Sequence, residues 1–269
     1  MIKPSMLKPG CRIGVVSPSY WLKKQYMEKT SKFFQDKGYT MVMGNSNSMK
    51  WGPFAGTPQE RADDIHHMFS NPKIEAIICA RGGYGANRVL PLLDYNLIRD
   101  NPKIFMGYSD ITAYLTSITQ KTGLVTFHGP MMVSYKKGFV NYNFQTMERI
   151  LNGTPDFKIE SPESLPARIL KPGIAMGPLW GGNMTLLINR LGTSDSLDTD
   201  GVILFLEDLD EYLYSFERML VQMRTAGMLD NIAGLIIGEL HEFKDQDVAF
   251  ERNTDEIVMD ICGDLEIPI

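Results

Sequence analysis

The first half of the chain alternates short apolar runs with longer amphipathic stretches. The apolar runs have the length of buried strands, roughly four to eight residues, and the amphipathic stretches repeat their apolar positions with a helical period. Such alternation predicts an α/β fold in which a parallel sheet carries helices on both faces. The predicted strands cover 12–19, 39–44, 74–80, 103–107 and 124–129, and the predicted helices cover 21–38, 57–72 and 110–121.

A second, smaller domain is predicted after a proline-rich segment. Residues 152–178 hold five prolines and little periodicity, which is typical of a linker or crossing segment. Beyond it come a strand at 201–208, a helix around 215–228 and a strand at 232–240. We therefore expect an N-terminal Rossmann-like domain at 1–155, a linker at 156–176 and a smaller mixed α/β domain at 177–269.

The last stretch of the chain is unusual. The segment 253–269 is typical of a helix that stops at Gly263 and is followed by the first residues of a new strand. Natural domains rarely leave such an edge unfilled. We therefore expect residues beyond Ile269 and regard the C-terminal domain as cut short.

Composition narrows the function classes. Apolar residues make up 43% and charged residues 22%, and the net charge of −5 argues against nucleic acid or an anionic membrane as the main partner. The apolar run at 13–16 is too short for a signal peptide, and no stretch reaches the roughly 18–20 apolar residues of a membrane span. Three scattered cysteines show no metal-ligand spacing and fit a reducing compartment. We expect a cytoplasmic protein without a metal.

The stretch Gly-Tyr-Ser-Asp, residues 107–110, joins a predicted strand to a predicted helix. A serine on such a sharp turn is typical of a nucleophile elbow, and the amides that open the next helix favour a developing oxyanion. Ile111 departs from the small residue that the usual elbow motif needs. The alternative is that Asp110 simply caps the helix and Ser109 is a turn residue.

The stretch Arg-Gly-Gly-Tyr-Gly, residues 81–85, follows another predicted strand at the same edge of the sheet. One interpretation is a plain turn that needs glycine. The other is that Gly82 and Gly83 bring backbone amides close to a bound carbonyl oxygen. The stretch is neither a dinucleotide-binding motif nor a P-loop, so no nucleotide cofactor is expected.

A serine nucleophile needs a base, normally a histidine oriented by a carboxylate. His66 and His67 lie mid-helix on a solvated face, whereas His128 lies on the same rim as Ser109 and His241 follows a strand in the second domain. Nothing in the pattern directs any of the four at Ser109.

Carboxylates are easier to place. Glu207 and Asp208 end an apolar strand and Glu211 lies in the following turn, where they either cap a helix or orient a histidine. The segment from Trp180 to Asn183 is predicted to be a loop that lines a pocket, although Trp180 equally suits the core.

Seven motifs together resemble the LD-carboxypeptidase family of murein tetrapeptide carboxypeptidases and microcin C resistance peptidases. They occur in the family's order and span nearly the whole chain. Only the position of Cys11, more often acidic in the family, departs from the pattern. The motifs are LKPGCRIGVVSPS, ICARGGYGANRVLPLLD, FMGYSDITA, GLVTFHGPM, GPLWGGNMTLL, ILFLEDLDEYLYSFERML and IAGLIIGEL.

The resemblance implies a serine peptidase with a Ser–Glu–His triad and no cofactor. Ser109 matches the nucleophile and Glu207 the triad glutamate. The amides of Gly83 and Asp110 would form the oxyanion hole. The substrate-binding residues would be Asn183, Trp180, Glu211 and Tyr84. In relatives the triad histidine follows the glutamate by roughly seventy residues, which lies past Ile269, and none of the four histidines here matches its motif.

The resemblance also implies a substrate and an assembly. The enzyme would release terminal D-alanine from murein tetrapeptide during cell-wall recycling, and it would form a homodimer with the cleft between its two domains. Relatives that resist microcin tend to have lysine at the position of Glu211, so we favour the murein peptide over a microcin-type peptide. Two other interpretations stay open: a catalytically silent peptide-binding protein, and an amidotransferase-like hydrolase with His128 as base.

Overall fold

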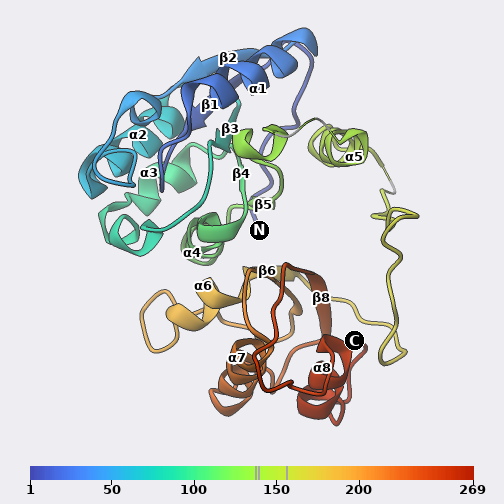
Figure 1. Ribbon diagram of the computed structural model, residues 1–269. Coiled ribbons are helices and arrows are strands. Elements are labelled where there is room, and N and C mark those ends of the chain that lie inside the picture. The colour runs from blue at the N-terminus through green and yellow to red at the C-terminus, as the bar shows by residue number, and fades with distance from the viewer. Residues whose placement is uncertain (137, 139, 156) are drawn as a thin grey trace. The chain divides into compact units, whose positions relative to one another are not determined.

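The computed structural model describes residues 1–136, 138, 140–155 and 157–269 of the chain. Two compact units make up the protein, Met1–Glu163 and Ser164–Ile269, each with a sheet and a core of its own (Figure 1). Within the described residues, no helix has the length and apolarity needed to cross a membrane.

The first unit is built on a parallel sheet of five strands in the order β2-β1-β3-β4-β5. This order reverses between β1 and β3, which is the switch point where open α/β sheets bind ligands. The predicted parallel sheet is therefore confirmed. The strands are β1 (Arg12–Val16), β2 (Thr40–Met43), β3 (Ala76–Cys79), β4 (Ile104–Gly107) and β5 (Phe127–His128).

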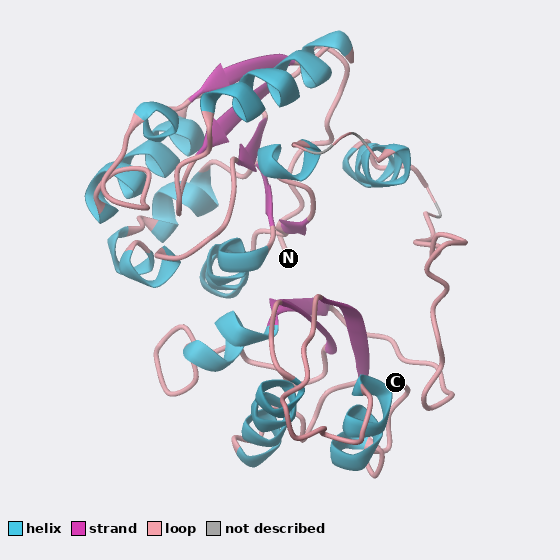
Figure 2. Cartoon of the chain, viewed as in Figure 1, coloured by secondary structure: helices cyan, strands magenta, loops and turns pink. Residues whose placement is uncertain are grey.

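Helices cover both faces of this sheet, as predicted (Figure 2). On one face Phe34 and Phe144 pack in a single core with side chains of β1 and β3. On the other face the ring of Phe105 contacts Phe69 and Tyr114, at centroid distances of 5.7 and 6.4 Å. The helices are α1 (Lys24–Asp36), α2 (Pro58–Ser70), α3 (Tyr95–Asp100), α4 (Thr112–Thr122) and α5 (Asn141–Leu151).

Local signals explain where some elements begin and why two predictions were too long. Helix α2 begins where predicted because Thr57 and Glu60 form a reciprocal capping box, with Pro58 in the first turn. Helix α1 begins only at Lys24, after Lys23 in an extended conformation. The strand predicted at 124–129 is reduced to β5, because Leu124 instead makes an isolated bridge with Ile2.

The second unit holds three parallel strands in the order β6-β7-β8 around a separate core. The segment from Trp180 to Asn183, predicted as a loop, is part of strand β6, which pairs with β7 along its whole length. The elements are β6 (Leu179–Asn183), α6 (Met184–Asn189), β7 (Ile203–Leu209), α7 (Leu213–Thr225), β8 (Gly234–His241) and α8 (Thr254–Cys262).

The predicted final strand is not formed as a named element. Helix α8 ends at Cys262, and 263–269 carries turns and extended backbone. Ile269 nevertheless exchanges backbone hydrogen bonds with Lys171, and Leu235 at the start of β8 donates to the Pro268 carbonyl. The terminal residues are thus held against the second unit by backbone pairing.

Candidate active site

The loops that follow β1, β3 and β4 meet at the carboxyl edge of the first sheet. The Tyr20 amide donates to the Gly82 carbonyl at 3.4 Å, which ties the loop after β1 to the loop after β3. A methyl group built on Gly82 would lie 3.0 Å from Ser109 Cβ and 3.1 Å from Ser109 Oγ. The two motifs that the sequence singled out are therefore in contact, and glycine at 82 leaves room for the serine.

Ser109 has the backbone of a strained turn residue. It follows β4 directly, opens the 3₁₀ turn η4 (Ser109–Ile111) that leads into α4, and has φ of +61°. A left-handed conformation is unfavourable for a residue with a Cβ atom and is found mostly where the surroundings enforce it, often at functional sites. The half-buried side chain is thus held by the backbone on a sharp strand–turn–helix junction.

Asp110 is not the N-cap of either helix at this junction, because Tyr108 holds that position for η4 and Ile111 for α4. The cap half of that alternative is therefore wrong, and the role of Ser109 stays a prediction. The Asp110 side chain is 1% exposed. Asp110 Oδ2 accepts hydrogen bonds from Ser19 Oγ at 2.5 Å and from the Ala86 amide at 3.0 Å. Burial raises the pKa of Asp110, while these two donors and the charge of Arg61 oppose the shift. The carboxyl group ties together the loops after β1, β3 and β4.

A buried arginine binds the backbone of two loops at this junction. Arg61 of α2 is fully buried and donates from Nη1 to the carbonyls of Pro18 and Gly85, at 2.7 and 3.2 Å. Tyr114 of α4 donates to the same Pro18 carbonyl at 2.8 Å. These bonds fix the backbone of the loops after β1 and β3, so the rim around Ser109 is held rigidly from below.

Two amides at this junction remain available. Within the part of the chain that the structure describes, no hydrogen bond occupies the backbone N–H of Gly83 or of Asp110. Gly83 has φ of +121°, and a methyl group there would overlap the ring of Tyr20. Backbone donors without partners beside a serine hydroxyl suit a developing oxyanion.

The second unit places Glu207 at an irregularity of its sheet. Glu207 pairs in register with Asn183, and the register between β7 and β8 shifts between Leu206 and Asp208. Burial, and then the neighbouring charge of Asp208, raise the pKa of Glu207 to about 7, against a hydrogen bond from Asn183. Glu207 Oε1 is buried without a hydrogen-bond partner among the described residues. Such an oxygen is suited to receive a donor.

Both carboxylate oxygens of Asp208 accept hydrogen bonds from nearby residues, which gives this side chain a structural role. Its Oδ1 accepts from Asn183 Nδ2 and from the Leu209 amide, at 2.8 and 2.9 Å. Its Oδ2 accepts from the amide and the hydroxyl of Thr185, at 2.9 and 2.8 Å. Asp208 therefore holds Asn183 beside Glu207 and connects β7 with the start of α6.

The remaining predicted binding residues lie in different surroundings. Tyr84 is 57% exposed and its ring lies 5.9 Å from that of Phe54. Trp180 is partly buried against the core of the second unit, so its observed contacts are those of a packing residue. Glu211 follows β7 in a turn, where its carbonyl accepts from the Lys244 amide at 2.9 Å.

The four histidines lie in different surroundings, and two of them contact polar groups of neighbouring residues. His66 Nε2 accepts from the Asp94 amide at 2.8 Å, and His67 is exposed. His241 Nδ1 lies 3.0 Å from Glu239 Oε1 and its Nε2 lies 3.6 Å from Glu242. His128 lines a mainly apolar cavity of about 160 Å³. Nearby protein atoms lower its pKa, but the residue is exposed, so water opposes that shift.

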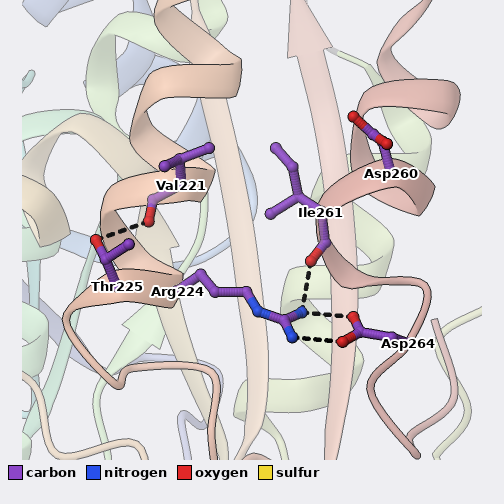
Figure 3. Close-up of a pocket in the computed structure, with 6 residues that line it drawn as sticks. All are labelled: Val221, Arg224, Thr225, Asp260, Ile261 and Asp264. Carbon is purple, nitrogen blue, oxygen red and sulfur yellow. Dashed lines mark hydrogen bonds and ion pairs between the residues drawn. The ribbon is translucent and has the colours of Figure 1, made fainter.

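A hollow of about 310 Å³ in the second unit does not belong to this chemistry. It is lined by the ends of α7 and α8, where Arg224 pairs with both carboxylate oxygens of Asp264 (Figure 3). Glu207 precedes the start of α7 and this hollow lies at its end, about 18 Å along the helix. The polar groups that Figure 3 draws in contact are satisfied by one another. Within the described residues, no group of acidic, histidine and cysteine side chains could hold a metal ion.

Sequence reasoning missed the buried residues that support the site. Ser19 ends the predicted strand 12–19 and Arg61 lies within the predicted helix 57–72, and the sequence marks neither as a candidate site residue. Their roles depend on contacts across 91 and 43 residues, so no local pattern shows them. The available signal was the pair of serines in Ser-Pro-Ser at the carboxyl end of the first strand.

The fold and the two residue clusters define an α/β protein of two compact units, with a serine on a strained turn in the first unit. Comparison with known families identifies it further. The N-terminal domain of LD-carboxypeptidases matches residues 13–129, and the C-terminal domain of that family matches 176–269. The chain belongs to the LD-carboxypeptidase family, as the sequence motifs predicted.

Several relatives agree with this assignment. The chain is 37% identical to a Bacillus subtilis protein named probable murein peptide carboxypeptidase, over 89% of the chain and 75% of the relative. A structure of MccF with glutamyl sulfamoyl guanosine superposes with a TM-score of 0.85 at 26% identity, covering 98% of this chain and 88% of that one. Muramoyltetrapeptide carboxypeptidase from Oxalobacter formigenes gives 0.84 at 27%, covering 96% and 86%.

Proposed function

We propose that the protein is a serine LD-carboxypeptidase that releases terminal D-alanine from murein tetrapeptide. The observation that carries the proposal is the junction at Ser109: a serine at φ of +61° after a buried strand, with unoccupied amides at Gly83 and Asp110. The names of the B. subtilis and O. formigenes relatives support the substrate.

The mechanism follows from the atoms of the site. Ser109 Oγ attacks the carbonyl carbon of the bond between the L-centre of diaminopimelate and D-alanine, and its proton passes to a base. The amides of Gly83 and Asp110 stabilise the oxyanion, and the nitrogen of D-alanine leaves after receiving that proton. Water then hydrolyses the ester, and the serine is regenerated.

Glu207 is proposed to orient the base of this reaction. Its unpartnered, buried Oε1 accepts a ring N–H, and a positive charge beside it restores the ionised form that burial disfavours. We propose that none of the four histidines of this sequence is that base. His66 and His241 are engaged with other groups, and none of the four matches the histidine motif of the family.

The test is release of D-alanine from L-Ala–D-Glu–meso-diaminopimelate–D-Ala, followed by mass spectrometry. It uses the printed chain and, in parallel, the longest form that the natural reading frame encodes. In an active form, Ser109→Ala lowers the rate by about 10⁴-fold or more. His128→Ala and His241→Ala act as matched controls and retain activity. Loss of activity in either control, or hydrolysis that survives Ser109→Ala, contradicts the assignment.

A microcin-type acyl-sulfamoyl peptide is the second candidate substrate. The similarity to MccF bound to glutamyl sulfamoyl guanosine favours it. Glu211 argues for the murein peptide, since an acidic side chain suits the amino groups of that peptide better than an anionic nucleotide-like group. Cleavage of glutamyl sulfamoyl adenosine at a higher kcat/KM than the tetrapeptide would reverse this preference.

We also propose that the protein acts in the cytoplasm as a homodimer, as the family resemblance implies. The free, buried thiols of Cys11, Cys79 and Cys262 suit a reducing compartment. Light scattering coupled to size-exclusion chromatography tests the dimer, and a monomer at micromolar concentration contradicts it.

A further inference from the structure

Aromatic rings and cations gather on the loops around the Ser109 junction. We use the term aromatic–cation cluster for Tyr20, Trp51, Phe54, Tyr84, Arg81 and Arg88. The ring of Phe54 lies 5.7 Å from Tyr20, 5.6 Å from Trp51 and 5.9 Å from Tyr84. Arg81 lies 5.5 Å over Tyr20, and Arg88 lies 5.2 Å over Trp51. Both guanidinium groups are therefore within the distance of a cation–π contact.

Arg81 is a charge without an acidic partner. In the described part of the chain no carboxylate pairs with it, whereas other arginines do pair with acids: Arg99, Arg168, Arg224 and Arg252. A guanidinium presents a planar row of N–H groups that matches both oxygens of a carboxylate. The half-buried side chain of Arg81 and its cation–π contact with Tyr20 reduce the ordering that such a bond requires.

Arg81 lies on the loop that packs against the nucleophile. Arg81 directly precedes Gly82, the glycine that packs on Ser109. The ring beneath the guanidinium is itself fixed, because Tyr20 packs against Gly83 and its amide bonds to Gly82. The cation therefore sits on the same glycine loop that carries one of the two proposed oxyanion donors.

A carboxypeptidase must recognise a free carboxylate at a set distance. The terminal carboxyl carbon of the substrate lies three bonds beyond the scissile carbonyl carbon, and these bond lengths keep the two atoms within about 4 Å. A group that binds it must therefore lie on the rim of the Ser109 junction. Among the arginines of the cluster, Arg81 adjoins Gly82, and Arg88 lies instead against Trp51.

We propose that Arg81 binds the terminal carboxylate of the substrate and thereby restricts cleavage to the last residue of the peptide. This rests on the proposed function, because it names the group of the substrate that the site selects. Arg81 is then a specificity-determining residue: it touches the leaving D-alanine and takes no part in the proton transfers.

The experiment compares the tetrapeptide with its C-terminal amide, which lacks the negative charge. Binding is measured by calorimetry in the Ser109→Ala background, and kcat/KM is measured with the serine present. The protein is expected to prefer the acid by about 10- to 100-fold, the range of a charge-assisted hydrogen bond. Arg81→Gln should remove this preference: the binding and kcat/KM of the acid fall, whereas those of the amide stay unchanged.

Two further variants separate charge from structure. Arg81→Lys retains the charge and restores part of the preference, and Arg88→Gln, the matched control on the same cluster, keeps the preference in full. The role of Arg81 is overturned if Arg81→Gln lowers the affinity for the acid and for the amide equally. It is also overturned if the unmodified protein shows no preference for the acid. If D-alanine is not released yet Ser109→Ala still selects the acid through Arg81, the proposed catalysis fails and the carboxylate site stands. If neither ligand binds, both proposals are overturned.

Discussion

At the scale of single residues, two side chains carry most of the unusual physical chemistry. Ser109 occupies a left-handed backbone conformation, and Glu207 is a carboxyl group with one buried, unpartnered oxygen. Each feature lowers stability and is found where surrounding structure enforces it. The supporting residues differ, since Asp110 and Asp208 are buried carboxyl groups whose oxygens accept hydrogen bonds.

Glu207 should make stability depend on pH in the printed chain. Its folded pKa of about 7 lies above the ordinary value of 4.5, so the folded state favours the protonated form. Ionisation therefore costs stability, from nothing below pH 4.5 to about 3 kcal/mol above pH 7. Relative to Glu207→Gln, the wild-type free energy of unfolding should fall by roughly this amount between pH 4 and pH 8 in urea titrations.

Asp208→Asn tests the second cause of that shift. It disturbs the bonds from Thr185 and should destabilise the second unit at both pH values. It also removes the charge that helps to raise the pKa of Glu207, so the fall in stability between pH 4 and pH 8 should be smaller. A Glu207→Gln protein that tracks the wild type across the whole pH range would show that Glu207 is not perturbed.

At the scale of elements, close backbone approach between β6 and β7 depends on glycine. Gly181 has φ of +137°, and a methyl group there would overlap the carbonyl oxygen of Phe205 on β7. Gly192 also has positive φ, +77°, but open space around it. The two positions therefore separate a clash with a neighbouring strand from backbone strain alone.

Gly181→Ala should be far more damaging than Gly192→Ala. The strain alone costs about 1–2 kcal/mol, whereas the clash should separate β6 from β7 and add about 3 kcal/mol or more. Because β6 carries Asn183, activity should be lost with the fold of the second unit. Equal destabilisation of the two variants in urea would show that β6 can move to accept a side chain.

At the scale of the whole molecule, two cores joined by an irregular segment should behave as two folding units. Between α5 and β6 the described residues form no helix or strand, and three apolar side chains there are largely exposed: Ile169 at 79%, Ile174 at 97% and Met176 at 90%. Exposed backbone without secondary structure is the preferred site of proteolysis.

Limited digestion with thermolysin should therefore cut first within 157–178. Mass spectrometry should find two resistant fragments that correspond to the two units. A first cut between β1 and α4 would contradict the prediction that the two cores fold independently. So would a digest that leaves no stable N-terminal fragment.

The sequence by itself determined the elements, the parallel sheets and the family, because apolar periodicity and turn residues act locally and the motifs occur in order along the chain. It also predicted Ser109, Gly83 and Glu207 as site residues, from their places at strand ends and from the family resemblance, and these roles stay predictions. The tertiary structure alone decided that Asp110 is a buried link rather than a helix cap and that the Gly-Gly-Asn segment is a strand. It also decided that Ser19 and Arg61 hold the loops beside the serine and that Arg81 lies over Tyr20. Those roles arise from contacts between residues distant in sequence, and hydrogen-bond partners, burial and pKa exist only once the chain has folded.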